Sequence, residues 1–168
     1  FDPSGRRECF TDLKDVQERQ YPLDHFKRLT TGAAAFAGCN ANLSSPLLFA
    51  AKDAGLLVAT DVHTIYDLDD DFNRDYMAQA DILFMSNERL PCSPEEWAQA
   101  VIDRYHTSIV VIGLGHEGAL LAVRDDRFLD RFPAVRTRDI VNTVGAGDAF
   151  CGALSARLSR DRVDPVLA

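Results

Sequence analysis

The sequence predicts an α/β fold: a doubly wound, mainly parallel sheet with helices on both faces. Three short apolar runs carry this prediction, at 56–59, 82–85 and 108–112. Strands of a parallel sheet are buried on both faces, so they read as unbroken apolar runs and not as alternating ones. Segments with helical signals separate the runs, and this alternation of strand and helix is typical of a sheet covered by helices.

The helical segments have recognisable beginnings. The first is expected to begin at 44–46, where serine suits the cap and proline the first turn, and to end at Gly55. A second helix is expected over about 73–80. The third begins at 93–96, where serine and glutamate have the spacing of a capping box. A last helix is expected from residue 145 onward, with apolar residues along one face.

The remaining segments are less regular. A weak strand or turn is expected over 31–37, and a fourth strand over 118–123. The stretch from 113 to 118 then forms a strand–turn–strand connection. Residues 1–31 are polar and mixed, and their pattern predicts no particular element.

Composition limits the class of protein. The chain has 168 residues, 46% of them apolar and 26% charged, which fits a single α/β domain over residues 1–168. Its net charge of −8 lacks the basic stripe that binds nucleic acid, so no nucleic-acid partner is expected. No apolar run reaches the length of a membrane span, so no membrane partner is expected. The four cysteines form no C-x-x-C pair, which predicts free thiols and a cytoplasmic protein.

A polar residue or a glycine follows each apolar run. Asp61, Asn87 and Gly113 stand at these three expected strand ends. Ligands of open parallel sheets bind beyond the carboxyl ends of the strands. We therefore expect the three positions along one ligand-binding edge, where the loop at 142–148 meets them.

The segment "IVNTVGAGDAF" predicts an anion-binding turn. Gly145 and Gly147 flank Ala146, so little side-chain bulk shields the backbone N–H groups. The turn leads directly into the expected helix, whose N-terminus adds partial positive charge. These amides suit a phosphate, or the charge that develops during phosphoryl transfer.

Asp148 follows this turn at once and has two interpretations. Aspartate is favoured in a first helical turn by the helix dipole, an effect of about 0.3 to 1 kcal/mol that needs no function. Alternatively, a carboxylate beside an anion hole serves as a general base. It accepts the proton of an attacking hydroxyl while the amides hold the phosphoryl oxygens.

The same stretch, extended to "NTVGAGDAFCGAL", closely resembles the second signature of the PfkB/ribokinase family of carbohydrate kinases, D-T-x-G-A-G-D-x-F. The resemblance implies that Gly145, Ala146 and Gly147 form the anion hole and that Asp148 is the catalytic base. It implies a ribokinase-like core, with ATP and Mg²⁺ as cofactors and, in some relatives, a monovalent cation near the signature. The implied reaction is transfer of the γ-phosphoryl group of ATP to a hydroxyl of a sugar or sugar-like substrate.

Looser resemblances extend from about residue 30 to the end. The segment "ADILFMSNERL" resembles the family's A-D-x-x-x-x-N-x-x-E, which implies that Asn87 lies near the nucleotide phosphates and contacts the metal through water. The segment "VVIGLGHEGALL" resembles V-V-x-T-x-G-x-x-G, which implies that Gly115 and Gly118 line the nucleotide. The segment "ATDVHTI" resembles the D-x-N end of a strand and supplies Asp61.

The sequence also departs from the family pattern. Asn142 stands where the family has aspartate, and Leu90 where it has glutamate, with Glu88 nearby but out of register. Family members are longer, with a sugar-binding N-terminal part that carries a small β lid and a C-terminal end that completes the adenine pocket. We therefore expect a piece of a longer ribokinase-like domain, with lid and C-terminal end missing.

These departures keep an alternative open: a catalytically inactive or truncated kinase-like domain that binds a nucleotide or a protein partner. We expect the 168-residue chain alone to be a poor kinase even where its full-length parent is active. A homodimer also stays open, because the family's lid often supplies the dimer interface.

Three other motifs fit this sequence less well. The stretch 113–118 has the G-x-G-x-x-G spacing of a dinucleotide fingerprint, but strand-like residues follow where a helix should stand. The acidic stretch 67–71 lacks the glycine and the terminal glutamate of an EF-hand loop. No G-x-x-x-x-G-K-[ST] is present, which excludes a P-loop enzyme. Amides and a metal would then meet the charge of the transferred group.

Overall fold

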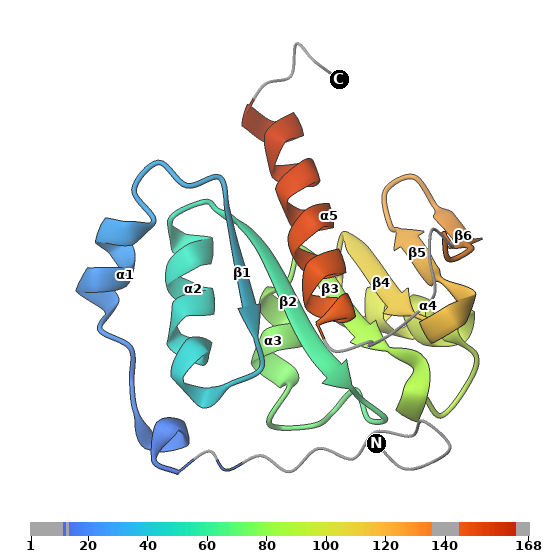
Figure 1. Cartoon of the computed structure of the whole chain (residues 1–168), viewed down its shortest axis with the longest axis horizontal. Coiled ribbons are helices and arrows are strands. Elements are labelled where there is room, and N and C mark those ends of the chain that lie inside the picture. The colour runs from blue at the N-terminus through green and yellow to red at the C-terminus, as the bar shows by residue number, and fades with distance from the viewer. Residues whose placement is uncertain (1–11, 13, 136–144, 164–168) are drawn as a thin grey trace.

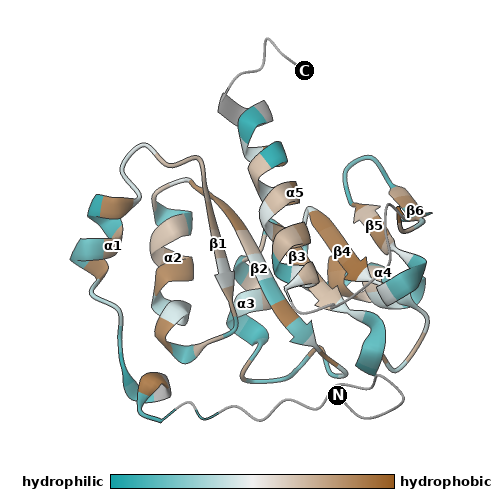
Figure 2. Cartoon of the chain, viewed as in Figure 1, coloured by the Kyte–Doolittle hydropathy of each residue, from teal (hydrophilic) through white to brown (hydrophobic). Residues whose placement is uncertain are grey.

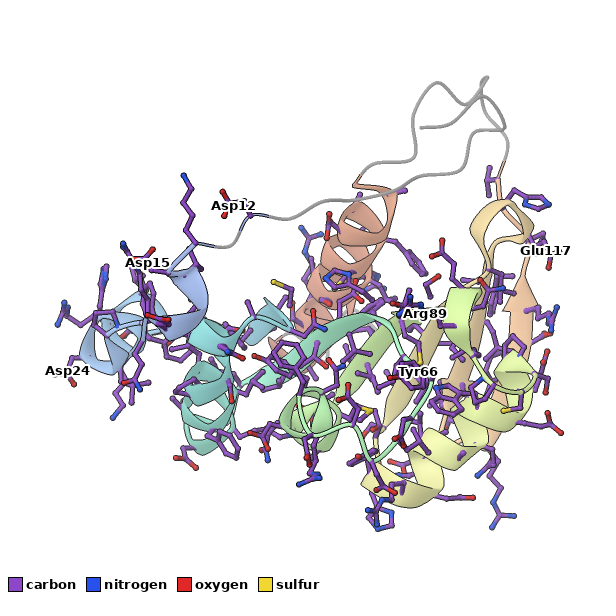
Figure 3. All side chains as sticks on the ribbon, turned by 90° about the horizontal axis from the view of Figure 1, so that it is seen from below. Asp12, Asp15, Asp24, Tyr66, Arg89 and Glu117 are labelled. Carbon is purple, nitrogen blue, oxygen red and sulfur yellow. The ribbon has the colours of Figure 1, made fainter. Side chains whose placement is uncertain are left out.

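The computed structural model describes residues 12, 14–135 and 145–163, which form three layers (Figure 1). The middle layer is a six-stranded sheet in the order β1-β2-β3-β4-β5-β6. The elements α1 to α4 pack on one face and α5 packs on the other, as the view turned by 90° shows (Figure 3). The predicted α/β fold, with a mainly parallel sheet and helices on both faces, is confirmed.

The elements are short and closely spaced along the chain. The strands are β1 (Ala35–Cys39), β2 (Leu57–Thr64), β3 (Ile82–Ser86), β4 (Ile109–Gly113), β5 (Ala119–Val123) and β6 (Phe128–Phe132). The α-helices are α1 (Leu23–Leu29), α2 (Ser45–Asp53), α3 (Arg74–Gln79), α4 (Pro94–Tyr105) and α5 (Ala146–Val163). The 3-10 turns are η1 (Val16–Glu18), η2 (Asn42–Ser44), η3 (Asn87–Arg89) and η4 (Gly115–Glu117). No helix in this part of the chain has the length and apolar character needed to cross a membrane.

Strand direction decides where the functional edge lies. Strands β1 to β4 pair in parallel, and β5 and β6 extend the sheet as an antiparallel hairpin. Because the helices α2, α3 and α4 return the chain between parallel strands, the carboxyl ends of β1 to β4 meet at one edge. This is the edge at which the sequence predicts a ligand.

Two strand boundaries differ from the prediction, and two elements were not predicted. The weak strand expected over 31–37 is β1, which lies a few residues later. β2 does not end at Asp61 but continues to Thr64, because a bulge after Asp61 lets the strand resume its pairing. The elements α1 and β6 were not predicted: α1 buries only Phe26, and every residue of β6 is exposed, so neither has a strong apolar pattern.

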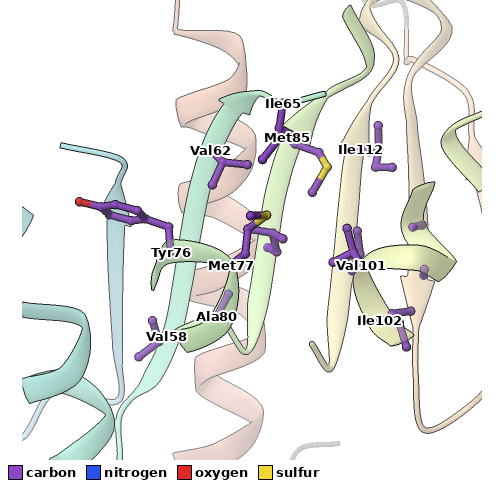
Figure 4. Close-up of a cluster of buried hydrophobic side chains, with 14 of the residues drawn as sticks. Val58, Val62, Ile65, Tyr76, Met77, Ala80, Met85, Val101, Ile102 and Ile112 are labelled. Carbon is purple, nitrogen blue, oxygen red and sulfur yellow. The ribbon is translucent and has the colours of Figure 1, made fainter. Parts of the chain in front are cut away.

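The larger core lies between the sheet and the helices α2 to α4, and Figure 4 shows its centre. Side chains from the strands, such as Val58 and Ile112, meet Tyr76 and Met77 of α3 and Val101 of α4 there. Each of these five residues is at most 1% exposed. The strands are correspondingly apolar over most of their length in Figure 2.

The smaller core lies under α5. It contains alternate residues of β2, β3 and β4 together with Cys151 of α5, while Leu154 and Leu158 of α5 pack at its margin. Alternation of this kind is expected for strands that are covered on both faces. One helix thus covers this face in the described part of the chain.

The start of α4 confirms the predicted capping box. The Ser93 hydroxyl accepts a hydrogen bond from the Glu96 amide at 3.3 Å, and the Glu96 carboxylate accepts one from the Ser93 amide at 3.1 Å. Two amides at the start of the helix are thereby satisfied, and the helix begins where the sequence predicts it.

Asp81 joins three elements at the start of β3. Its carboxylate accepts a hydrogen bond from the Lys52 ammonium of α2 at 2.7 Å and another from the Val58 amide of β2 at 2.8 Å. The Asp81 side chain is 20% exposed. Its loss would leave a backbone amide of a central strand without an acceptor.

We expect Asp81→Ala to lower the free energy of unfolding by about 1 to 3 kcal/mol, because the Val58 amide stays buried and unpaired. The control Lys52→Met removes the ion pair but keeps the hydrogen bond from the Val58 amide to Asp81. It should lower the free energy of unfolding by less than about 1 kcal/mol. Chemical denaturation of both variants measures the difference. Equal losses in the two variants would contradict the role given to the amide.

Gly118 is required by close packing. Its φ is +112°, and a Cβ added there would lie 2.0 Å from the Phe132 carbonyl oxygen and 2.7 Å from the Ala134 nitrogen. The end of β6 therefore lies directly on this glycine. Gly115, at φ +61°, has no atom within 4 Å of an added Cβ.

We expect Gly118→Ala to destabilise the fold well beyond Gly115→Ala, because the first variant displaces backbone and the second meets only an unfavourable φ. The Gly115 variant should cost about 1 kcal/mol. Thermal and chemical denaturation give both values. A Gly118 variant as stable as the Gly115 variant would show that β6 does not need this contact.

Candidate functional site

A small cavity of about 180 Å³ opens at the carboxyl ends of β1 and β2, beneath the start of α5. The residues that line it come from these three elements: Ala37, Gly38, Cys39, Asp61, Asp148, Cys151 and Gly152. The structure thus brings together two positions that the sequence singled out, Asp61 and Asp148. These two residues are 87 positions apart in the sequence.

The sheet wall of the cavity follows from strand register. Ala37 and Cys39 are two residues apart, so their side chains lie on the same face of β1. Cys39 pairs with Asp61 of β2. Ala59, two residues before Asp61, packs in the core under α5, which places the Asp61 side chain on the α5 face as well.

The helix wall follows from helical spacing. Asp148, Cys151 and Gly152 are three and four residues apart and therefore share one face of α5. Farther along this face Cys151 and Ser155 are buried against the sheet, whereas Asp148 in the first turn is exposed. The Phe150 ring contacts the Phe84 ring edge-on, with 6.0 Å between centroids, and so holds the first turn above β3.

Backbone amides at the start of α5 lie beside Asp148. The helix begins at Ala146, and the first helical bond runs from the Ala149 amide to the Gly145 carbonyl at 2.9 Å. The amides that precede it have no acceptor within the helix. Gly145 has φ +79°, and a Cβ added at Gly145 or Gly147 would have no atom within 4 Å. The three residues of the predicted anion hole are therefore exposed and not packed against protein.

The Asp61 carboxylate is held in place by the bulge of β2. Its Oδ1 accepts a hydrogen bond from the His63 amide at 2.8 Å, and His63 adopts a left-handed φ of 58°. The His63 Nδ1 lies 3.8 Å from the same oxygen, on a side chain that is 56% exposed. Bulges often lie next to functional sites, where they direct a side chain.

The end of β1 is anchored by buried hydroxyl groups. The Ser44 hydroxyl donates to the Cys39 carbonyl at 2.8 Å, and the Tyr76 hydroxyl donates to the Ala41 carbonyl at 2.6 Å. Burial raises the pKa of Tyr76, so its hydroxyl stays a donor. Cys39 was not predicted as a site residue. A correct boundary for β1 would have placed it at the functional edge.

The Cys151 thiol is buried at the inner end of the cavity. Burial raises its pKa, and the negative charges of Asp61 and Asp148 raise it further. The thiol is therefore kept protonated, and the charges of both carboxylates contribute to this effect. Cys39, Cys92 and Cys151 are free thiols, as the sequence predicts for the described part of the chain.

The three predicted nucleotide-binding residues lie elsewhere on the same edge. Asn87 is exposed directly after β3, and Gly115 is exposed after β4. Neither they nor Gly118 line the cavity. Asn142 lies outside the described residues.

Leu90 occupies the position at which the family pattern has glutamate. It packs at the margin of the larger core, while Glu88 is exposed beside Asn87. In the residues that the structure describes, no group of three or more His, Cys, Asp or Glu side chains is placed to hold a metal ion.

The fold is similar to that of solved carbohydrate kinases. A microbiome-derived acarbose kinase matches with a TM-score of 0.78 and 25% identity, over 92% of this chain and 52% of its own. The aminoimidazole riboside kinase of Salmonella enterica matches with a TM-score of 0.59 and 28% identity, over 74% of this chain and 47% of its own. The fructokinase of Vibrio cholerae O395, in a form with fructose, ADP and calcium bound, matches with a TM-score of 0.57 and 27% identity, over 73% and 45%.

Two curated relatives match over shorter segments. The aminoimidazole riboside kinase of Salmonella typhimurium is 52% identical over 50 residues, which is 30% of this chain and 15% of that protein. The ATP-dependent 6-phosphofructokinase isozyme 2 of Mycobacterium tuberculosis is 44% identical over 69 residues, which is 40% and 20%. This chain thus spans about half the length of the solved relatives and a fifth or less of the curated ones.

The family model described as "pfkB family carbohydrate kinase" matches residues 74–164. This match covers more than half of the 168 residues. It includes β3 with Asn87, the strand–turn–strand around Gly115, and the first turn of α5 with Asp148. The chain therefore belongs to the pfkB family of carbohydrate kinases.

Proposed function

We propose that the protein transfers the γ-phosphoryl group of ATP to a hydroxyl of a sugar or sugar-like small molecule. One observation carries the proposal: the exposed Asp148 carboxylate lines a cavity at the carboxyl edge of the sheet, next to helix amides that have no partner within the helix. Membership of a carbohydrate kinase family supports it. So do similar proteins that are named as kinases of fructose and aminoimidazole riboside.

Asp148 serves as the general base. The acceptor lies in the cavity with one hydroxyl directed at the Asp148 carboxylate, which takes the proton as the hydroxyl oxygen attacks the γ-phosphorus. A new bond from oxygen to phosphorus forms while the bond from the γ-phosphorus to the bridging oxygen of ADP breaks. The products are the phosphorylated acceptor and ADP, and the proton leaves Asp148 for solvent.

The amides at 145–147 hold the oxygens of the group in transfer. They lie one to three residues before the base, and the positive end of the α5 dipole adds to their effect. An open space beside Gly145 and Gly147 fits this role, because phosphoryl oxygens must approach the backbone closely. Bound Mg²⁺ would neutralise charge on the β- and γ-phosphates, and we propose Asn87 as a residue that would contact it through water.

The nucleotide and the acceptor then occupy two parts of one edge. Asn87 follows β3 and Gly115 follows β4, whereas the cavity lies at β1 and β2. The first turn of α5 lies between these parts, since α5 packs on β1 and β2 and Phe150 contacts Phe84 of β3. Such an arrangement suits an in-line transfer past the amides.

A kinase-like domain that binds a nucleotide or a protein partner without phosphoryl transfer is the second candidate. Leu90 favours it, because an apolar side chain packed at the core replaces the glutamate of the family pattern. The two candidates differ in one measurement, which is turnover of ATP that depends on a sugar acceptor and on Asp148.

We expect Asp148→Asn to lower kcat by about 10²- to 10⁴-fold in a coupled assay of ADP release, because asparagine cannot accept the proton. The Asp148 side chain is exposed, so the free energy of unfolding should change by less than about 0.5 kcal/mol. Asp126→Asn, an exposed carboxylate in the β5–β6 turn, is the control and should keep full activity. Undiminished turnover in the Asp148 variant would reduce this residue to a helix-capping role.

Gly147→Ala tests the amides separately from the base. The added methyl group meets no protein atom, and alanine is the better helix former by about 1 kcal/mol, so stability should be kept or raised. We expect kcat to fall at least about tenfold, because the methyl group enters the space of the phosphoryl oxygens. Ser159→Ala alters the same helix away from the cavity and is the control. A stable, fully active Gly147 variant would rule out phosphate contact at this turn.

A further inference from the structure

The cavity beneath α5 contains a second carboxylate that the proposed transfer step does not use. Asp148 enters it from the first turn of α5, and Asp61 enters it from β2, beside Cys39. None of the described residues that line the cavity is lysine, arginine or histidine. Two negative groups therefore face this space from the helix and from the sheet.

Only one oxygen of Asp61 has a hydrogen-bond donor in the part of the chain that the structure describes. Oδ1 accepts from the His63 amide at 2.8 Å, which fixes the plane of the carboxylate. Oδ2 can still accept hydrogen bonds. The Asp61 side chain is only 16% exposed and lines the cavity, so a donor for Oδ2 would come from a molecule in the cavity and not from open solvent.

Asp61 also has the right neighbours for contact with a bound molecule. Its β-strand partners at the same level of the sheet are Cys39 on one side and Phe84 on the other. Cys39 lines the cavity, and Phe84 packs against Phe150 of α5. Phe150 thus closes the Phe84 side of Asp61, and Cys39 and Asp61 form the part of the sheet that a molecule beneath Asp148 would touch.

We propose that Asp61 binds a second hydroxyl of the acceptor and so selects a polyhydroxylated compound with an unphosphorylated end at the transfer site. This inference rests on the proposed function. A carboxylate accepts strong hydrogen bonds from hydroxyl groups. A phosphate in the same space would face two carboxylates without a cation from the lining, so the site disfavours an acceptor that presents a phosphate there.

A purely structural role for Asp61 makes a different prediction. If the carboxylate only supported the bulge of β2, asparagine would replace it, because its side-chain oxygen can still accept from the His63 amide. Asp61→Asn therefore keeps the bulge and removes the negative charge. Recognition of a hydroxyl should suffer in this variant while the fold does not.

The test combines this variant with modified acceptors. Full-length wild type, Asp61→Asn and the control Asp126→Asn are assayed with D-ribose, D-fructose and aminoimidazole riboside. The acceptor with the highest kcat/KM is then compared with its mono-deoxy analogues. We expect Asp61→Asn to raise KM for the parent acceptor roughly 10- to 100-fold, with KM for ATP unchanged and kcat within about threefold of wild type.

The decisive result is the behaviour of the analogues. For one mono-deoxy analogue, wild type should already show the raised KM, and Asp61→Asn should raise it no further, because the hydroxyl that Asp61 binds is missing. If Asp61→Asn raised KM by the same factor for the parent acceptor and for every analogue, the inference would be overturned in favour of a structural role. An unchanged KM for the parent acceptor would overturn it as well.

These outcomes are separate from failure of the proposed function. If wild type phosphorylates none of the three acceptors, the proposed function fails and the inference fails with it. If wild type is active and Asp148→Asn is not, the proposed function stands, and the analogue series alone decides on Asp61.

Discussion

The parallel pairing of β1 with β2 is the constraint on which the candidate site depends. It sets Cys39 beside Asp61 on the face of the sheet that α5 covers. A slip of one residue would turn these side chains toward α2 and α3, into the larger core, because side-chain direction in a strand alternates with every residue. The buried hydroxyls of Ser44 and Tyr76 secure the end of β1 against such a change.

The two cores divide scaffold from function. The larger one, between the sheet and α2 to α4, is made of buried apolar side chains and holds the strands in register. The smaller one lies under α5, and its member nearest the cavity is Cys151, one turn after Asp148. The same face of α5 therefore changes from packed to exposed within a single turn. That transition is what allows a helix fixed by packing to present a carboxylate at a cavity.

Charge is also arranged by position along the edge. Amides and the positive end of the α5 dipole lie at residues 145–147, whereas the carboxylates of Asp61 and Asp148 face the cavity. On the proposed function this separates two tasks: the transferred anion is held by the amides, and the neutral acceptor is held by the carboxylates. If the anion and the acceptor exchanged places, the phosphate would lie beside the two carboxylates, whose negative charge would repel it.

Local signals in the sequence determined much of this protein. Unbroken apolar runs predicted the strands β2 to β4, the serine–glutamate spacing predicted α4, and the glycine turn predicted the start of α5 with Asp148, because each of these depends on neighbours within a few residues. Tertiary structure decided the rest. Cys39 joined the cavity through strand pairing, Asp61 acquired its orientation through a bulge, and Gly118 proved to carry the packed end of β6. These features depend on contacts between segments far apart in the chain, and no periodicity or motif within one segment encodes them.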